Sequence, residues 1–199
     1  MSEASTTRRI LITGGGGYIG TQLIGRLLRR PAESIFVVAT DVREAPHPHN
    51  APNVAYETLE VRDPQLVERL THHNIDTVVH LASIVTPGKK HDRDFEYSVD
   101  VRGTENVLKC CVAAGVEHLI VTSSGAAYGY YADNPVPIPE DAPLRGNPEF
   151  TYSDNKRQIE ERLAQYRHEH PELKQLIFRP GVVLGENTNN QITDLFRKR

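Results

Sequence analysis

A run of four glycines, at positions 14–17, constrains this chain more than any other feature. It lies between a short apolar run, residues 8–13, and a segment whose apolar residues recur at helical spacing. Gly14, Gly17 and Gly20 form the pattern Thr-Gly-x-x-Gly-x-x-Gly. Glycine permits positive φ and close approach to the backbone, and a helix N-terminus offers unpaired N–H groups. We interpret the run as a cradle for a pyrophosphate rather than a linker. No Gly-Lys-Ser/Thr follows, which excludes a P-loop.

The rest of the chain alternates between apolar strands and amphipathic helices. This alternation predicts a parallel sheet covered on both faces, which binds ligands beyond the carboxyl ends of its strands. Strands are expected at residues 8–13, 34–41, 53–60, 76–83, 117–124 and 174–180, and helices after the glycine run and at about 63–73, 94–114 and 150–170.

Composition excludes several classes of function. The formal net charge of −3 favours neither nucleic acid nor an anionic membrane, and no apolar run approaches the roughly 20 residues that cross a bilayer. The adjacent Cys110 and Cys111 lack metal-ligand spacing, so we expect buried thiols in a reducing cytoplasm. The proline-flanked His47 and His49 are compatible with a metal site, but we favour a solvated loop and predict no metal.

Acidic residues follow the second and third expected strands. Asp41 stands about twenty residues beyond the glycine run, where a carboxylate would bind the adenosine ribose hydroxyls and repel a 2′-phosphate, favouring NAD over NADP. Arg43 is a complication, because it could contact such a phosphate. Asp63 has two equally weighted interpretations: a helix cap, or a partner of the adenine amino group. Small residues after His80 would let a cofactor lie against the backbone, and His80 itself is expected to be a packed strand histidine.

A serine and a tyrosine–lysine pair lie near the next strand end. Tyr152 and Lys156 are four residues apart and share one helix face. A nearby ammonium and a positively charged nicotinamide would lower the pKa of a phenol toward the range of a useful base. A serine hydroxyl could hold the substrate oxygen beside it. We therefore predict catalysis by this set.

Together these motifs resemble the extended short-chain dehydrogenase/reductase family, of the NAD-dependent epimerase/dehydratase type. The likeness covers nearly all of residues 8–185 and rests on TGGGGYIG, Asp41, Asp63, HLAS, VDVRGTENVL, SSGAAYG, YSDNK and FRPGVVLG. It implies an α/β fold, with a Rossmann-like, doubly wound parallel sheet in three α/β/α layers and strand order 3-2-1-4-5-6. It also implies an NAD-binding domain at 8–185 and the start of a truncated C-terminal substrate region at 186–199. The polar residues 1–7, before the region of likeness, are expected to form a disordered tail.

The resemblance also implies roles for individual residues. Ser124 lies four residues before Tyr128 of the Tyr-Gly pair and would be the catalytic serine, Tyr152 the acid/base, and Lys156 the ribose-binding lysine. Substrate contacts are expected from Ser124, Gly125 and Tyr152. Cofactor contacts are expected from Gly14, Gly17, Tyr18, Ile19, Gly20, Asp41, Asp63, Leu81, Ala82, Ser83, Tyr152, Lys156 and Arg179.

Three departures from the family pattern matter. Asp100 replaces the Asn of Asn-Val-x-Gly-Thr, which puts the local geometry in doubt. Gly125 and Ala126 replace the Asp-Glu pair of sugar-nucleotide dehydratases, which argues against water elimination. The chain stops at residue 199, whereas family members continue into the substrate domain.

The resulting hypothesis is an NAD-dependent epimerase or dehydrogenase that acts on the hydroxyl of a sugar or sugar nucleotide. The alternative is a non-catalytic dinucleotide-binding sensor or scaffold, or an inactive fragment. In the loop at 125–148, Tyr130, Tyr131 and Arg145 are substrate-contact candidates or ordinary surface residues. The family also implies a homodimer that pairs the helices expected at 94–114 and 150–170.

Overall fold

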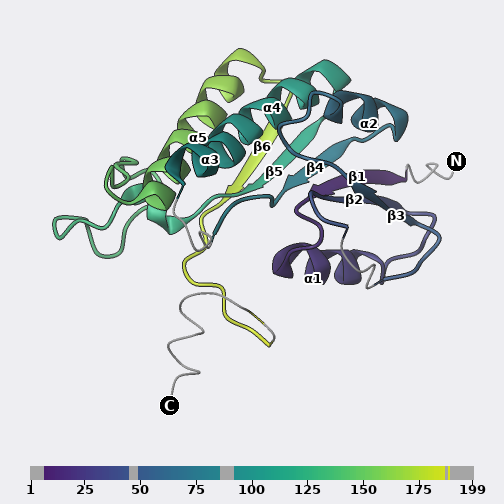
Figure 1. The fold of residues 1–199 in the computed structure, drawn as a ribbon, viewed down its shortest axis with the longest axis horizontal. Coiled ribbons are helices and arrows are strands. Elements are labelled where there is room, and N and C mark those ends of the chain that lie inside the picture. Colours follow the sequence, from purple (N-terminus) through teal and green to yellow (C-terminus); the bar gives the residue numbers. More distant parts are fainter. Residues whose placement is uncertain (1–6, 45–48, 86–91, 187, 189–199) are drawn as a thin grey trace, which may run out of the picture.

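Six parallel strands form one sheet in the computed structural model, which describes residues 7–44, 49–85, 92–186 and 188. The strand order is β3-β2-β1-β4-β5-β6, as the sequence predicts (Figure 1). This is the order of a Rossmann-like sheet. The strands are β1 (Arg8–Thr13), β2 (Ile35–Asp41), β3 (Val54–Thr58), β4 (Thr77–His80), β5 (His118–Thr122) and β6 (Lys174–Phe178).

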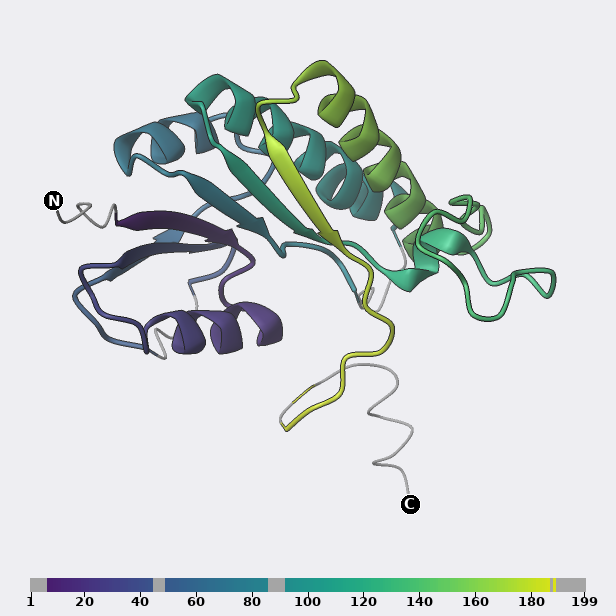
Figure 2. The same ribbon diagram turned by 180° about the vertical axis from the view of Figure 1, so that it is seen from behind.

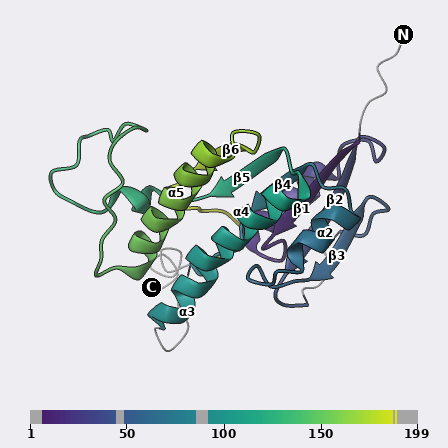
Figure 3. The same ribbon diagram turned by 90° about the horizontal axis from the view of Figure 1, so that it is seen from above.

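Helices cover the two faces of the sheet unequally. Figure 2 shows α1 on one face, against the β1–β3 half, and the other labelled helices on the opposite face. Seen from above in Figure 3, α2, α4 and α5 lie side by side across the strands. The helices are α1 (Tyr18–Leu27), α2 (Leu66–His72), α3 (Arg93–Tyr97), α4 (Gly103–Ala114) and α5 (Thr151–Glu169), with a π-helical turn at Ser98–Arg102 and a 3₁₀ turn at Gly125–Tyr128.

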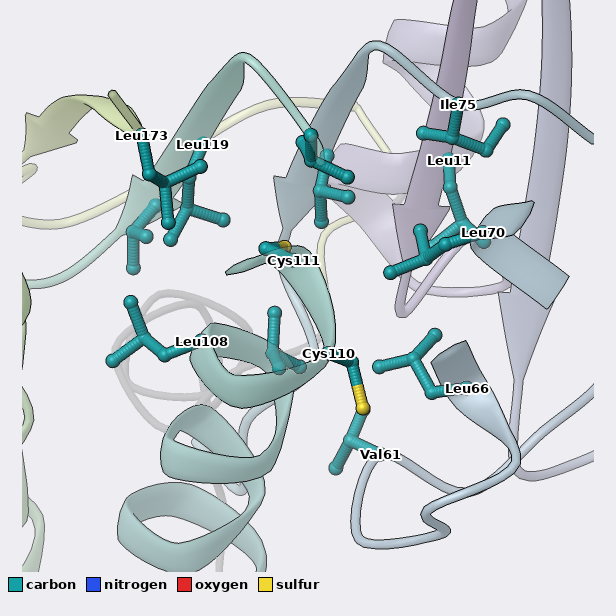
Figure 4. Packing of buried hydrophobic residues seen from close by; sticks show 14 of the residues in the cluster. Leu11, Val61, Leu66, Leu70, Ile75, Leu108, Cys110, Cys111, Leu119 and Leu173 are labelled. Atoms are coloured by element: carbon teal, nitrogen blue, oxygen red, sulfur yellow. The ribbon is translucent and has the colours of Figure 1, made fainter. Parts of the chain in front are cut away.

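The main core lies between the sheet and the layer of α2, α4 and α5. Figure 4 shows Leu11 and Leu119 of the sheet facing side chains of α2 and α4. Cys110 and Cys111 are free and buried, as predicted, and burial raises the pKa of both thiols. A second, smaller cluster packs α1 against β1 and β2 through Ile24 and other apolar side chains. These two clusters hold the strand ends at one edge of the sheet.

The face of β6 that carries Leu176 and Phe178 remains half exposed. These side chains are 51% and 53% exposed, whereas the alternating Ile177 packs against the main core. Figure 2 shows no helix over this part of the sheet within the described residues. None of the described helices is long and apolar enough to cross a membrane.

Two helix boundaries differ from the prediction. The helix expected from Asp63 begins at Leu66, because Asp63 and the two residues after it form a turn that is closed by the Leu66 N–H on the Asp63 carbonyl. The helix expected at 94–114 is broken by the π-helical turn, which apolar periodicity alone does not reveal. Gly115 ends α4 at φ +70°, as expected of a glycine cap.

Residues 1–6, His47 and most of 186–199 lie outside the described residues.

Candidate functional site

The candidate site lies at the carboxyl edge of the sheet, where parallel strands end together. Thr13, the last residue of β1, pairs with Thr40 of β2 and with His80 of β4. β5 ends at Thr122, next to Ser123 and Ser124. The fold therefore brings the glycine run, Asp41 and the serines to one edge, although they are far apart in sequence.

The glycine loop leaves the N-terminus of α1 open to an anion. Gly14 has φ +69°, and a Cβ there would lie 2.8 Å from the Ala82 nitrogen. A Cβ on Gly20 would lie 2.5 Å from the Gly14 carbonyl oxygen. Gly17 is the N-cap, no side chain caps the helix, and its first turn holds no acidic residue. The first-turn N–H groups therefore fit a phosphate, as the cradle interpretation requires.

Residues around the first turn of α1 line the approach to this cradle. Ile19 is 37% exposed in the first turn. The Tyr18 hydroxyl lies against Gly185, a residue beyond the end of β6. The chain after β6 thus returns to the start of α1, so any ligand on this N-terminus would lie beside it.

Asp41 lies beside the loop at the end of β2. Its Oδ2 accepts from the Gly16 N–H at 3.2 Å and its Oδ1 from the Arg43 N–H at 3.1 Å. The Arg43 guanidinium approaches the same carboxylate, with Nε 3.5 Å from Oδ1, and is largely exposed. The carboxylate that would select NAD and the cation that would accept a 2′-phosphate therefore contact one another.

Asp63 and residues 81–83 occupy the neighbouring strand ends. Asp63 Oδ1 accepts from the Gln65 N–H at 2.8 Å within the turn before α2, so Asp63 is not the N-cap of that helix, and its adenine role stays a prediction. The N–H groups of Leu81 and Ala82 donate to Thr13 Oγ1 at 3.2 and 3.3 Å. Ala82 packs directly against Gly14, and Ser83 follows it toward the buried Asp100. These backbone contacts bring the end of β4 against the glycine loop.

A buried hydrogen-bond chain connects this edge to the π-helical turn. The Thr104 hydroxyl donates to the Asp100 carbonyl at 2.6 Å, so His80 Nε2–H donates to Thr104 at 3.0 Å. His80 Nδ1 then accepts from the Thr13 hydroxyl at 2.7 Å. Burial, with a smaller contribution from the charge of Lys156, lowers the pKa of His80 to about 3. His80 is the packed, neutral histidine that the sequence predicts.

Ser124, Tyr152 and Lys156 converge on this edge from β5 and α5. Ser124 is buried, and its Oγ accepts from the Ala126 N–H at 3.1 Å at the start of the 3₁₀ turn. Lys156 is 3% exposed and donates to the Thr122 carbonyl at 3.3 Å. Its Nζ is 5.6 Å from the centre of the Tyr152 ring. The three predicted catalytic residues therefore lie together.

The protein by itself does not lower the pKa of the Tyr152 phenol. Burial raises this pKa most, the Ser124 hydroxyl lowers it, and the charges of Asp100 and Tyr130 raise it. The sequence argument expected Lys156 to favour the phenolate. Burial instead sets the direction of the shift at Tyr152, and burial also lowers the pKa of Lys156 itself. A cationic group bound next to the phenol would act in the opposite direction.

Sequence reasoning missed a buried ion pair behind the site. Glu160 is 2% exposed, and both of its oxygens accept from Arg179 Nε at 2.9 Å. It also accepts from the Ser123 hydroxyl at 2.6 Å. Helical spacing places Glu160 on the same face of α5 as Lys156, four residues further on, but it does not indicate Arg179, which follows a different element. Arg179 also donates to Tyr128 and to a carbonyl of the 125–148 loop, so its cofactor contact stays a prediction.

Two of the three candidate residues in the loop after the 3₁₀ turn contact other residues of the same loop. Tyr131 donates to the Gly146 carbonyl at 2.7 Å, and the Arg145 guanidinium lies 3.9 Å from the centre of its ring. Tyr130 is 68% exposed, and its ring lies 6.1 Å from that of Phe150, which lies 6.1 Å from that of Tyr152. The Phe150 ring therefore contacts the rings of both Tyr130 and Tyr152.

Fold and site together define a Rossmann-like domain with a glycine loop and a Ser-Tyr-Lys set at the same edge. The model of the NAD dependent epimerase/dehydratase family matches residues 10–198, and the chain belongs to this family.

Individual relatives agree with this assignment. UDP-glucose 4-epimerase of Erwinia amylovora is 28% identical over 92% of this chain and 56% of its own length. A relative in Escherichia coli O157:H7, N-acetyl-alpha-D-glucosaminyl-diphospho-ditrans,octacis-undecaprenol 4-epimerase, is 31% identical over 95% of this chain and 53% of its own length. The chain thus spans about half the length of the curated relatives it matches.

Solved structures share the fold. That of UDP-glucose 4-epimerase of Thermus thermophilus, a complex with NAD, superposes with a TM-score of 0.75 at 26% identity, covering 91% of this chain and 57% of its own. The Bordetella bronchiseptica enzyme WbmH, in complex with NAD+, has a TM-score of 0.81 at 22% identity, covering 96% and 61%, which supports the fold alone.

Proposed function

We propose that this chain is the cofactor-binding part of an NAD-dependent epimerase or dehydrogenase that acts on the hydroxyl of a sugar or sugar nucleotide. The observation that carries the proposal is the convergence of Ser124, Tyr152 and Lys156 on the edge that holds the glycine loop. The family assignment and the epimerases among its relatives support the sugar-nucleotide class. In this division, residues 8–185 bind NAD, and residues 186–199 lead into the substrate region.

The cofactor would extend along the carboxyl edge. Its pyrophosphate would lie on the N-terminus of α1, against Gly14, Gly17 and Gly20, with Tyr18 and Ile19 beside it. Asp41 would bind the adenosine ribose and Asp63 the adenine, while residues 81–83, Lys156 and Arg179 would complete the site. When bound, NAD supplies the hydride acceptor of the reaction.

The protein's own residues would handle the proton and the orientation of substrate. The Ser124 hydroxyl would donate to the substrate oxygen and hold it beside the phenol. The phenolic oxygen of Tyr152 would take the hydroxyl proton as the carbinol is oxidised and return it when a ketone is reduced. Lys156 would bind ribose hydroxyls and stabilise the phenolate. Gly125 would lie against the substrate, and Tyr130 would contact it as well.

The homodimer that the resemblance implies is also a proposal. It would pair α4 and α5, which lie side by side in the outer layer of the molecule (Figure 3). Sedimentation equilibrium of the purified chain tests it, and a monomer at all concentrations would argue against it.

A fluorescence titration with NADH and NADPH tests the cofactor proposal. We expect tighter binding of NADH, and a loss of about tenfold or more for Asp41→Ala, because a charged hydrogen bond to ribose is removed. Asp94→Ala changes an exposed carboxylate on α3 and serves as the control. Equal binding, or a preference for NADPH, would transfer selectivity to Arg43 and refute the NAD assignment. A folded chain that binds neither would not be a working dinucleotide domain.

A turnover assay with UDP-glucose as the probe separates an enzyme from a sensor. Tyr152→Phe should lower turnover by about 10²–10⁴-fold while NADH binding persists. Tyr166→Phe, on the same helix, should leave turnover unchanged. An active chain that tolerates Tyr152→Phe would refute the acid/base role. NADH binding without turnover of sugar nucleotides would favour the sensor or fragment.

A further inference from the structure

The backbone on either side of Ser124 is hydrogen-bonded to the segment that follows β6. The N–H groups of the residues before and after this serine donate to the Phe178 and Pro180 carbonyls, at 2.8 and 3.0 Å. Arg179 is the residue between these two carbonyls. The candidate catalytic serine is therefore held against the segment from which the Arg179 side chain enters the buried ion pair.

The guanidinium of Arg179 joins this segment to two other parts of the fold. Its Nε and Nη2 donate to the carboxylate of Glu160 on α5, at 2.9 and 2.6 Å. Its Nη1 donates to the Tyr128 hydroxyl, at the end of the 3₁₀ turn, at 2.5 Å, and to the Glu140 carbonyl at 2.6 Å. A planar guanidinium with five N–H donors can make all these contacts at once.

Helix α5 contacts the serine segment along one buried face. Three of its side chains, each 3% exposed or less, hydrogen-bond to residues 122–126: Ser153 at 2.7 Å, Lys156 at 3.3 Å and Glu160 at 2.6 Å. The first two donate to backbone carbonyls. Glu160 instead accepts from the Ser123 hydroxyl and from Arg179, so it meets both sides of the serine segment.

The charges of Glu160 and Arg179 make this the strongest attachment between α5 and the serine segment. Hydrogen bonds between charged groups are roughly twice as strong as those between neutral groups. Breaking a buried pair leaves a charge that must regain water or another partner. Because the pair lies between α5 and the chain after β6, its loss would let these elements separate.

Ser124 and Tyr152 would contact the same substrate oxygen in the proposed reaction, although they lie on different elements. Ser124 follows β5, whereas Tyr152 lies in the first turn of α5. A displacement of about 1 Å between reacting groups can lower a rate about 100-fold. Contacts that fix one element against the other should therefore act on the chemical step.

We propose that Glu160 and Arg179 are positioning residues for the reaction under "Proposed function", on which this inference rests. The pair fixes the turn that carries Ser124 against the helix that carries Tyr152 and Lys156. Through the Tyr128 hydroxyl, Arg179 also fixes the far end of that turn.

A kinetic double-mutant cycle with UDP-glucose as the probe tests this role. Glu160→Gln removes the carboxylate charge, and Tyr128→Phe removes one hydroxyl. Each variant keeps the side chains proposed to bind cofactor and substrate. We expect kcat to fall about 100-fold and about tenfold respectively, with KM and the Kd of NADH changed less than about twofold. Because both act through Arg179, the double variant should lose little more than Glu160→Gln alone.

The cycle is measured at a temperature where circular dichroism shows every variant to be folded. Tyr166→Phe, on the outer part of α5, is the matched control and should leave kcat unchanged in both backgrounds. Losses that multiply in the double variant, or that arise in KM, would overturn the proposal.

Amide hydrogen exchange on the chain without cofactor tests the same attachment independently of turnover. We expect Glu160→Gln to speed exchange at the Ser123 and Gly125 N–H groups about tenfold more than at the amides of β1. Tyr128→Phe, which keeps the charge pair, should show the same pattern to a smaller extent. Glu161→Gln, which breaks an exposed pair with Arg157, should not change the ratio.

The pattern of exchange distinguishes a local role from a contribution to global stability. Equal acceleration of all amides in Glu160→Gln would show that the pair stabilises the fold without positioning the serine, and would overturn the proposal. Local acceleration in a chain that turns over no sugar nucleotide would support the attachment while refuting the proposed catalysis.

Discussion

Gly20 shows how one residue determines whether the cradle can form. A Cβ at this position would lie 2.5 Å from the Gly14 carbonyl oxygen and 2.8 Å from the Gly15 Cα. Both are backbone atoms, so a change of side-chain conformation could not relieve the clash with the added Cβ. The spacing of glycines in the sequence thus reflects contact between the loop and the first turn of α1.

We expect Gly20→Ala to displace the loop and weaken NADH binding. Overpacking of this kind costs about 1–3 kcal/mol of unfolding free energy. Urea unfolding and NADH titration measure the two effects. Gly181→Ala is the matched control, because a Cβ there meets no atom within 4 Å. If Gly20→Ala bound NADH as the parent does, the cradle geometry would be wrong.

His80 makes stability depend on pH. Its pKa is about 3 in the folded protein and near 6.5 when unfolded, so between these values only the unfolded chain takes up the proton. The contribution of His80 to the free energy of unfolding is therefore complete above pH 6.5 and is lost as the pH falls toward 3. We expect a loss of about 2 kcal/mol between pH 7 and pH 5 from this group.

Urea unfolding at the two pH values checks this prediction. In His80→Asn, the loss of unfolding free energy between pH 7 and pH 5 should be smaller by about 2 kcal/mol than in the parent chain. This difference should hold whatever the stability of the variant at pH 7. The full pH dependence should persist in His168→Asn, where the side chain is exposed. An unchanged pH dependence in His80→Asn would show that His80 is not the responsible group.

At the scale of elements, α5 connects the candidate site to the rest of the fold. One face of this helix carries Tyr152, Lys156 and Glu160, the last of which joins β6 through Arg179. Ser153 donates to the Ala126 carbonyl at 2.7 Å and so attaches the helix to the 3₁₀ turn after β5. The position of the catalytic candidates therefore depends on polar contacts that α5 makes with two neighbouring strand ends.

We expect Glu160→Gln to destabilise the chain by about 3 kcal/mol, because it leaves Arg179 without its carboxylate. Glu161→Gln is the adjacent control. Its ion pair with Arg157 is about half exposed on the acidic side and should be worth less than about 1 kcal/mol. Urea midpoints of the two variants decide the matter, and similar losses would mean that the buried pair contributes no more than the surface one.

At the scale of the whole molecule, the proposed cofactor would join two halves of the sheet. The glycine loop follows β1 and Asp41 ends β2, whereas Ser124 follows β5 and Tyr152 and Lys156 lie on α5. A ligand bound along the edge would contact both halves of the folded chain and neither half of the unfolded one.

Bound NAD should therefore raise the melting temperature. At a free concentration of 100 times Kd, one site adds about 2.7 kcal/mol of stability. Differential scanning calorimetry with and without NAD measures the shift. Gly20→Ala should show a much smaller shift at the same concentration. If saturating NAD left the melting temperature of the parent chain unchanged, this result would contradict an NAD site in the native state.

The sequence by itself determined the architecture and the identity of the candidate residues. Alternating strands and helices predicted the parallel sheet. Local patterns predicted the glycine cradle, the Gly115 cap and the buried cysteines, because each depends on backbone conformation or on the periodicity of neighbouring residues. The packed state of His80 could also be predicted from its place in an apolar strand.

Only the tertiary structure decided which charges face one another. The Glu160–Arg179 pair and the chain from Thr13 to Asp100 join residues from different elements. Burial, which raises the pKa of Tyr152 where local sequence suggested a lower one, is likewise a property of the packed molecule. Electrostatic energy depends on distance and on exclusion of water, and neither exists until the strands and helices are assembled.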